Sequence, residues 1–128
     1  MGNGQIRDTA RVNRVCNAVF YMQDGCCVND LEARVLTVSE WGFRISSSMR
    51  SDACAGVIIS FPDGEAKTIA LLADKVEIQP FVTDKNQCVY DCKFPGECVT
   101  AKNFLKKRSR SHRKTLYRKA EDQTACEA

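Results

Sequence analysis

Apolar and β-branched residues recur along residues 15–94 in short runs, and turn-forming residues separate one run from the next. Turn signals such as Asp24-Gly25 and Pro62-Asp63-Gly64 fall between these runs. Each run is therefore expected to form a β-strand. The runs are Val15–Met22, Leu31–Val38, Phe43–Ser46, Val57–Phe61, Thr68–Leu72, Val76–Ile78 and Cys88–Phe94.

Six or more short strands at this spacing predict a mostly β protein, built as a small antiparallel barrel. Closure of a barrel removes the unpaired strand edges that a small sheet would otherwise expose. One basic helix is expected after the barrel, over residues 101–120, and its apolar face is thin. We divide the chain into a flexible N-terminal arm (1–14), a barrel (15–98) and a C-terminal basic helix with a tail (99–128).

The 128 residues fit one domain, and the apolar content of 44% is ordinary for a globular protein. No apolar stretch is long enough to span a membrane, and the first residues do not form a secretory signal, so we expect a cytoplasmic protein. The eight cysteines do not follow zinc-site spacing, and His112 is the single histidine. We therefore expect no metal, no cofactor and no disulfide framework.

The charge is distributed unevenly along the chain. Residues 1–100 carry a net charge of −3, residues 101–120 carry +9, and the last eight residues carry −3. The basic segment could contact nucleic acid or an anionic membrane, could be a solvated helix, or could dock on the acidic barrel. Few aromatic residues are interleaved with its cations, so we expect no specific nucleic-acid recognition and treat it as a partner surface of unknown kind.

Two groups of residues form candidate binding motifs. Arg7 and Arg11 are four residues apart ahead of the first apolar run, and Ser39 and Gly42 lie in the turn that follows Thr37. Arginine donates two parallel hydrogen bonds from a planar fork, which suits phosphates and guanine edges. A serine hydroxyl and a glycine in a turn also serve ordinary hairpin structure, so the turn alone leaves both roles open.

Taken together, these motifs resemble the PilZ family of bacterial cyclic di-GMP receptors, whose signature is an RxxxR pair followed by [D/N]xSxxG. Arg7 and Arg11 match the pair, and Ser39 and Gly42 match the second motif. The resemblance covers roughly residues 7–94 and implies a six-stranded barrel. It implies that the two arginines clamp guanine and phosphate, while Ser39 and the turn around Thr37 hold the other side of the ligand.

The chain departs from the family pattern at two positions. Thr37 stands where the family has Asp or Asn, and Asp91 stands where a glycine often precedes the last phenylalanine. A threonine offers one neutral hydroxyl in place of a carboxylate, so the resemblance implies weaker binding, which Thr37→Asp would strengthen. Trp41, the sole tryptophan, is a further candidate because it could stack on a guanine.

The resemblance implies a receptor or adaptor that binds cyclic di-GMP, orders its N-terminal arm and signals to an unidentified protein partner. The alternative is a degenerate PilZ-like domain that binds no nucleotide and acts as an interaction module. A third possibility makes the basic helix the functional part. The chain contains no glycine-rich phosphate loop, no HExxH and no nucleophile elbow, so we expect no enzymatic activity.

Overall fold

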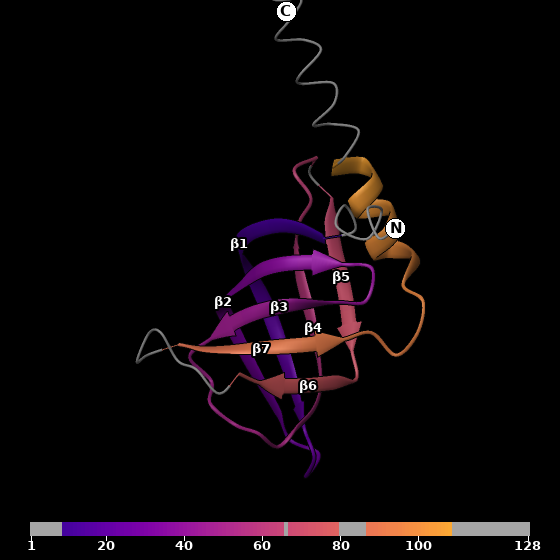
Figure 1. Cartoon of the computed structure of the whole chain (residues 1–128). Coiled ribbons are helices and arrows are strands. Elements are labelled where there is room, and N and C mark those ends of the chain that lie inside the picture. Colours follow the sequence, from indigo (N-terminus) through magenta and orange to yellow (C-terminus); the bar gives the residue numbers. More distant parts are fainter. Residues whose placement is uncertain (1–8, 66, 80–86, 109–128) are drawn as a thin grey trace, which may run out of the picture.

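The structure is a computed structural model that describes residues 9–65, 67–79 and 87–108. Its main feature is one antiparallel sheet of seven strands, with the hydrogen-bonded order β5-β4-β1-β2-β3-β7-β6. Figure 1 shows how this sheet curls. The strands are β1 (Thr9–Met22), β2 (Cys27–Ser39), β3 (Gly42–Ser47), β4 (Cys54–Pro62), β5 (Thr68–Ala73), β6 (Lys75–Ile78) and β7 (Cys88–Lys93).

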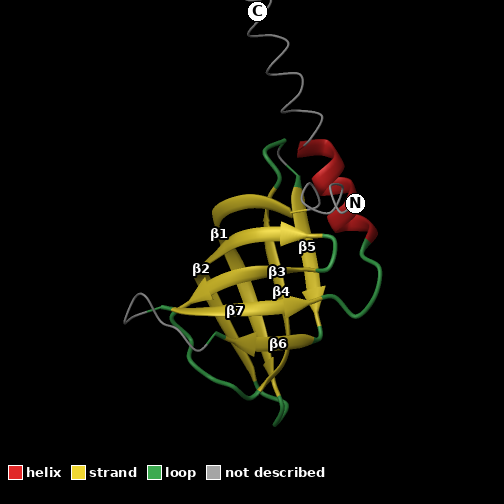
Figure 2. Cartoon of the chain, viewed as in Figure 1, coloured by secondary structure: helices red, strands yellow, loops and turns green. Residues whose placement is uncertain are grey.

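The sheet has a barrel-like form. Its order begins at β5 and ends at β6, and β6 also approaches β4 although no ladder joins these two strands in the described residues. A helix over residues 99–108 lies at one end of the sheet (Figure 2). The expected class, mostly antiparallel β with a C-terminal helix, is confirmed. The sheet has seven strands where the resemblance implies six, because the predicted run Val76–Ile78 forms a strand of its own, β6, in a ladder with β7.

The division at residue 14 is wrong, because β1 begins at Thr9 and its first residues pair with β2. Residues 9–14 therefore belong to the sheet, and residues 1–8 lie outside the described part of the chain. Arg11, Asn13 and Arg14 interrupt the apolar run here. Arg11 and Asn13 are exposed, and Arg14 is a half-buried polar residue opposite Val35. The register between β1 and β2 shifts at a bulge around Asn13, whose φ is 52°.

Two arginine side chains hold the bulged part of β1. Arg34 donates from Nη1 to the carbonyl oxygen of Asn13 at 3.1 Å. Arg108, from the helix, donates from Nη2 to the carbonyl oxygen of Arg11 at 3.0 Å. A bulge disrupts the regular ladder, and these side-chain donors supply hydrogen bonds to main-chain acceptors there.

The core lies inside the curl of the sheet and is built mainly from apolar residues that alternate along the strands. Phe20 and Tyr90 are fully buried and their ring centroids are 5.4 Å apart. The Tyr90 hydroxyl accepts a hydrogen bond from the Ser51 amide and donates to the Met49 carbonyl oxygen. Burial raises the pKa of Tyr90 to about 12, so the hydroxyl stays protonated and keeps its donor.

The described helix is attached to the sheet by apolar and ionic contacts. Phe104 packs edge-on against Phe61 with ring centroids 5.6 Å apart. Lys107 lies 3.4 Å from a carboxylate oxygen of Asp63 and 2.5 Å from one of Glu65, in the β4–β5 connection. In its described part, the basic segment thus uses cations to dock on acidic residues of the sheet. The expected continuation of the helix over 109–120 lies outside the described residues.

Candidate ligand-binding face of the β2–β3 hairpin

Five residues on five neighbouring strands form one row across the sheet. Arg11 on β1 pairs with Thr37 on β2, and Thr37 pairs in turn with Arg44 on β3. Arg44 pairs with Asp91 on β7, which pairs with Glu77 on β6. Opposed residues in antiparallel strands point to the same face. Arg44 is exposed between two buried neighbours, so the row lies on the outer face of the sheet.

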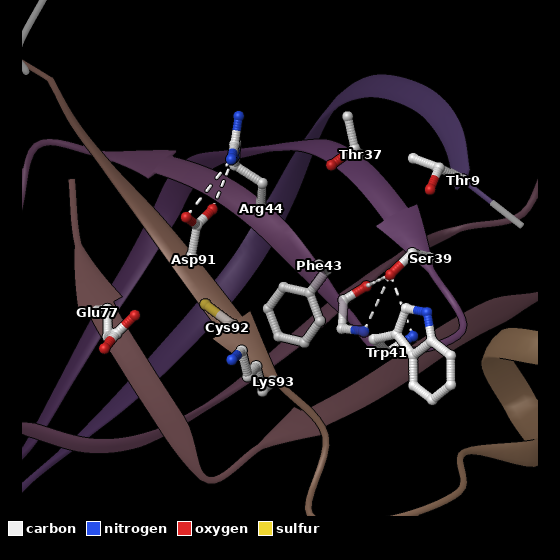
Figure 3. Close-up of a pocket in the computed structure, with 11 residues that line it drawn as sticks. Thr9, Thr37, Ser39, Trp41, Phe43, Arg44, Glu77, Asp91, Cys92 and Lys93 are labelled. Carbon is white, nitrogen blue, oxygen red and sulfur yellow. Dashed lines mark hydrogen bonds and ion pairs between the residues drawn. The ribbon is translucent and has the colours of Figure 1, made fainter. Parts of the chain in front are cut away.

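A hollow of about 410 Å³ covers much of this row. That volume falls within the range of small-molecule sites. Figure 3 shows Arg44 and Asp91 together in one part of the hollow, with Ser39 and Trp41 in another. The lining residues are Thr9, Thr37, Ser39, Trp41, Gly42, Phe43, Arg44, Glu77, Asp91, Cys92 and Lys93.

The Ser39 hydroxyl is fully engaged by the turn that it begins. Its oxygen accepts hydrogen bonds from the main-chain amides of Trp41 and Gly42, both at 3.1 Å. The hydroxyl also lies 3.2 Å from the Gly42 carbonyl oxygen, to which it donates. A hydroxyl has one donor and two acceptor positions, and all three are used here (Figure 3). Ser39 therefore shapes the hairpin.

Gly42 is required by the close approach of β7 to β3. A Cβ at this position would lie 2.9 Å from the Cα of Lys93 and closer still to the Cys92 carbonyl oxygen. These are main-chain atoms held in a ladder, so they cannot move aside cheaply. The glycine serves the packing of two strands, and this accounts for it without any ligand.

Thr37 and Trp41 are the motif residues whose side chains the turn does not use. The Thr37 side chain is half-buried on the outer face beside Arg44. Trp41 is 69% exposed at the tip of the hairpin, so its indole presents a flat apolar surface to solvent. An exposed aromatic at a pocket edge can stack on a base or contact a partner protein.

The structure places only one arginine of the RxxxR pair. Arg11 is exposed and lies opposite Thr37, next to the hollow but outside its lining. Arg7 lies outside the described residues. Four of the six predicted site residues, Thr37, Ser39, Trp41 and Gly42, therefore line one hollow, and Arg11 lies in the same row as Thr37. Their role in binding a ligand stays a prediction.

Sequence reasoning missed a polar cluster formed by Arg44 and Asp91, which line the hollow, and Gln79, which contacts Asp91. Arg44 donates from Nε to Asp91 Oδ1 at 2.6 Å and from Nη2 to Asp91 Oδ2 at 3.4 Å. Gln79 donates from its amide nitrogen to the second of these oxygens. The alternation of Arg44 with the buried Phe43 and Ile45 indicated its outward direction, but its pairing with Asp91 depends on the register of β3 and β7.

The formal charges of the residues that line the hollow balance. Arg44 and Lys93 supply two positive charges, and Asp91 and Glu77 supply two negative ones. The remaining titratable lining residue is Cys92, whose pKa is raised well above its usual value by burial. Its thiol therefore stays protonated and is a poor nucleophile or metal ligand. A strongly anionic ligand would depend on additional cations such as Arg11.

No protein-family model matches this chain, and no curated protein matches its sequence. Within the described residues, no helix combines the length and the apolar character needed to cross a membrane. The resemblance to the PilZ family consequently rests on the motif residues alone.

Proposed function

We propose that the outer face of the β2–β3 hairpin binds cyclic di-GMP and that the protein acts as a receptor for this nucleotide. Arg11 would donate to phosphate or to a guanine edge from one side, and Trp41 would offer a stacking surface at the hairpin tip. Ser39 and Gly42 would hold the hairpin in shape. Arg7 would join Arg11 when the ligand binds, and a partner protein would respond to that change.

The observation that carries this proposal is the pairing of Arg11 with Thr37 across β1 and β2. It brings a residue of the first motif beside a residue of the second, although the two are 26 positions apart in the sequence. Both lie on the outer face, next to a hollow of a size suited to a nucleotide. Nothing in the described fold requires the guanidinium of Arg11, since its contact with Arg108 uses the main-chain carbonyl.

A second candidate function is an interaction module that binds no nucleotide. Trp41 also borders a second hollow of about 440 Å³, on the side of the hairpin that faces the helix. Its other lining residues are Glu40, Phe94, Gly96, Glu97 and Lys102. An exposed tryptophan between two hollows is typical of a protein contact, because buried aromatic side chains dominate interface energetics.

The two functions are separated by titration with cyclic di-GMP, observed through main-chain amide shifts and calorimetry. Nucleotide binding should shift the amides of Thr9, Arg11 and residues 37–44 together. Arg11→Ala should weaken binding roughly 10- to 100-fold, since a charge-assisted hydrogen bond contributes about 1.5–3 kcal/mol. The matched control is Arg50→Ala, which removes the same charge from an exposed residue in the β3–β4 loop.

An unchanged spectrum at about 0.1 mM cyclic di-GMP, which corresponds to a free energy of roughly 5–6 kcal/mol, would reject the receptor and favour the interaction module. Equal losses for Arg11→Ala and Arg50→Ala would show that overall charge, and not this face, attracts the nucleotide.

A further inference from the structure

We infer that Arg44 is an additional ligand-binding residue of this hollow and that Asp91 and Gln79 position it. The ligand group that it would take is a pair of neighbouring hydrogen-bond acceptors, such as two phosphate oxygens or the N7 and O6 atoms of guanine. This inference rests on the proposed function, because it names the part of the nucleotide that Arg44 would bind. No motif contains these three residues.

The geometry of the ion pair leaves one edge of the guanidinium open. Asp91 takes the side edge of Arg44, formed by Nε and one N–H of Nη2. The end edge, formed by Nη1 and the other N–H of Nη2, has no partner among the described residues. A planar guanidinium can bind one acceptor pair on each of these edges at the same time. Arg44 is half-exposed, so a ligand in the hollow can reach the end edge.

The hydrogen bonds of Asp91 indicate that it positions Arg44 and does not compete with the ligand for it. Both of its oxygens accept hydrogen bonds from Arg44, and Oδ2 also accepts one from the half-buried Gln79. If Arg44 left to bind a ligand, the carboxylate would lose two donors while facing Glu77 on the next strand. Keeping Arg44 on Asp91 and binding the ligand through the other edge avoids that loss.

Thr37, the neighbour of Arg44 on β2, explains why a pair of hydrogen-bond acceptors fits beside Arg44. Thr37, which faces Arg44 across β2 and β3, carries no charge. A carboxylate at position 37 would compete with the ligand for the open edge of Arg44. It would also place hydrogen-bond acceptors, in place of donors, on this side of the pocket. With threonine, the wall offers donors, so it favours the acceptor edge of a base or a phosphate.

The test measures binding of inorganic pyrophosphate, cyclic di-GMP and cyclic di-AMP to the full chain. In parallel, the Nε–H signal of Arg44 is followed by NMR. Arg44→Gln should weaken binding about 10-fold, while the charge-matched control Lys67→Gln, at an exposed residue beyond β4, should leave it unchanged. If Arg44 takes phosphate, all three ligands lose affinity alike. If it takes guanine, only cyclic di-GMP does, because adenine presents a donor in place of O6.

The sign of the Asp91→Ala effect is the sharpest readout. Removing a negative charge should strengthen the binding of an anion if Asp91 only repels the ligand or competes for Arg44. A positioning role predicts the opposite: several-fold weaker binding and a broadened Arg44 Nε–H signal, with Gln79→Ala acting in the same direction to a smaller extent. Stronger binding by Asp91→Ala would overturn the inference.

The two proposals fail in different ways. Normal binding of cyclic di-GMP by Arg44→Gln would reject the role of Arg44 and leave the receptor intact. Binding of pyrophosphate that depends on Arg44, without any binding of cyclic di-GMP, would reject the receptor and keep the inference. Absence of binding by all three ligands would reject both. A denaturant titration of each variant shows whether it is folded.

Discussion

The turn that contains Ser39 and Gly42 and the row that contains Arg11 and Thr37 differ in how the fold uses their side chains. Both hold positions of the motifs that resemble the PilZ signature. In the turn, each distinctive group is used by the fold: the hydroxyl makes three hydrogen bonds, and the glycine admits β7. In the row, the side chains face outward beside a hollow. A signature can thus combine residues that build a surface with residues that are available to use it.

This comparison shows where ligand contacts must come from. A polar group that is already saturated can contact a ligand only by giving up an internal partner, which costs part of the hydrogen-bond energy. Contacts on this face are therefore expected from side chains with open donors or flat surfaces, such as Arg11, Arg44 and Trp41. Substitutions should accordingly affect stability in the turn and binding in the row.

The largest expected effect is at Gly42. Gly42→Ala should reduce the free energy of unfolding by about 3 kcal/mol or more, because the added methyl group would collide with the main chain of β7. Chemical denaturation measures this loss. Gly96→Ala is the matched control, since a Cβ there meets no atom within 4 Å, and it should change stability by less than about 0.5 kcal/mol. Similar stabilities for both variants would show that β3 and β7 are not this close.

A smaller effect is expected at Ser39. Ser39→Ala removes the group that accepts two main-chain amides, and the loss should be about 1–2 kcal/mol of unfolding free energy. The same denaturation experiment measures it, with Ser48→Ala at an exposed position as the control. If Ser39→Ala abolished cyclic di-GMP binding while stability stayed normal, the hydroxyl would be a ligand contact and the division between turn and row would be wrong.

The smallest expected effect is at Thr37, and its direction matters more than its size. The family pattern alone implies that Thr37→Asp strengthens cyclic di-GMP binding. The position of Arg44 directly opposite reverses this expectation, because the new carboxylate would take the open edge of the guanidinium. We expect about 10-fold weaker binding by calorimetry, or about 1.4 kcal/mol. Thr37→Asn, which adds no charge, should bind within a few-fold of the unchanged protein; stronger binding by Thr37→Asp would contradict the role of Arg44.

Much of the fold could be predicted from the sequence because most strands carry their apolar side chains in uninterrupted or alternating runs. The start of β1 could not, because Arg14 is polar at a half-buried position and Val15 is apolar at an exposed one, which breaks the expected alternation. The start of β2 was missed for a similar reason, since Asn29 and Asp30 are polar residues within a strand. Polar outer faces and bulges are the features that a periodicity argument handles least well.

The candidate site was predictable only where its residues belong to one of the two motifs. Thr37, Ser39 and Gly42 could be found together because one turn holds them. Arg44 and Asp91 could not, because they are 47 residues apart and meet only through the register of β3 against β7. Register depends on packing across the whole sheet, and a single sequence does not reveal it.

The hydrogen bond from Arg108 to the carbonyl oxygen of Arg11 joins residues 97 positions apart. During synthesis the N-terminal part of a chain emerges first, at about 5–20 residues per second. Roughly 5 to 20 s therefore pass between the synthesis of Arg11 and that of Arg108, whose side chain binds the start of β1. The sheet can assemble in that interval, whereas the start of β1, which places Arg11 beside the hollow, gains its contact with the helix last.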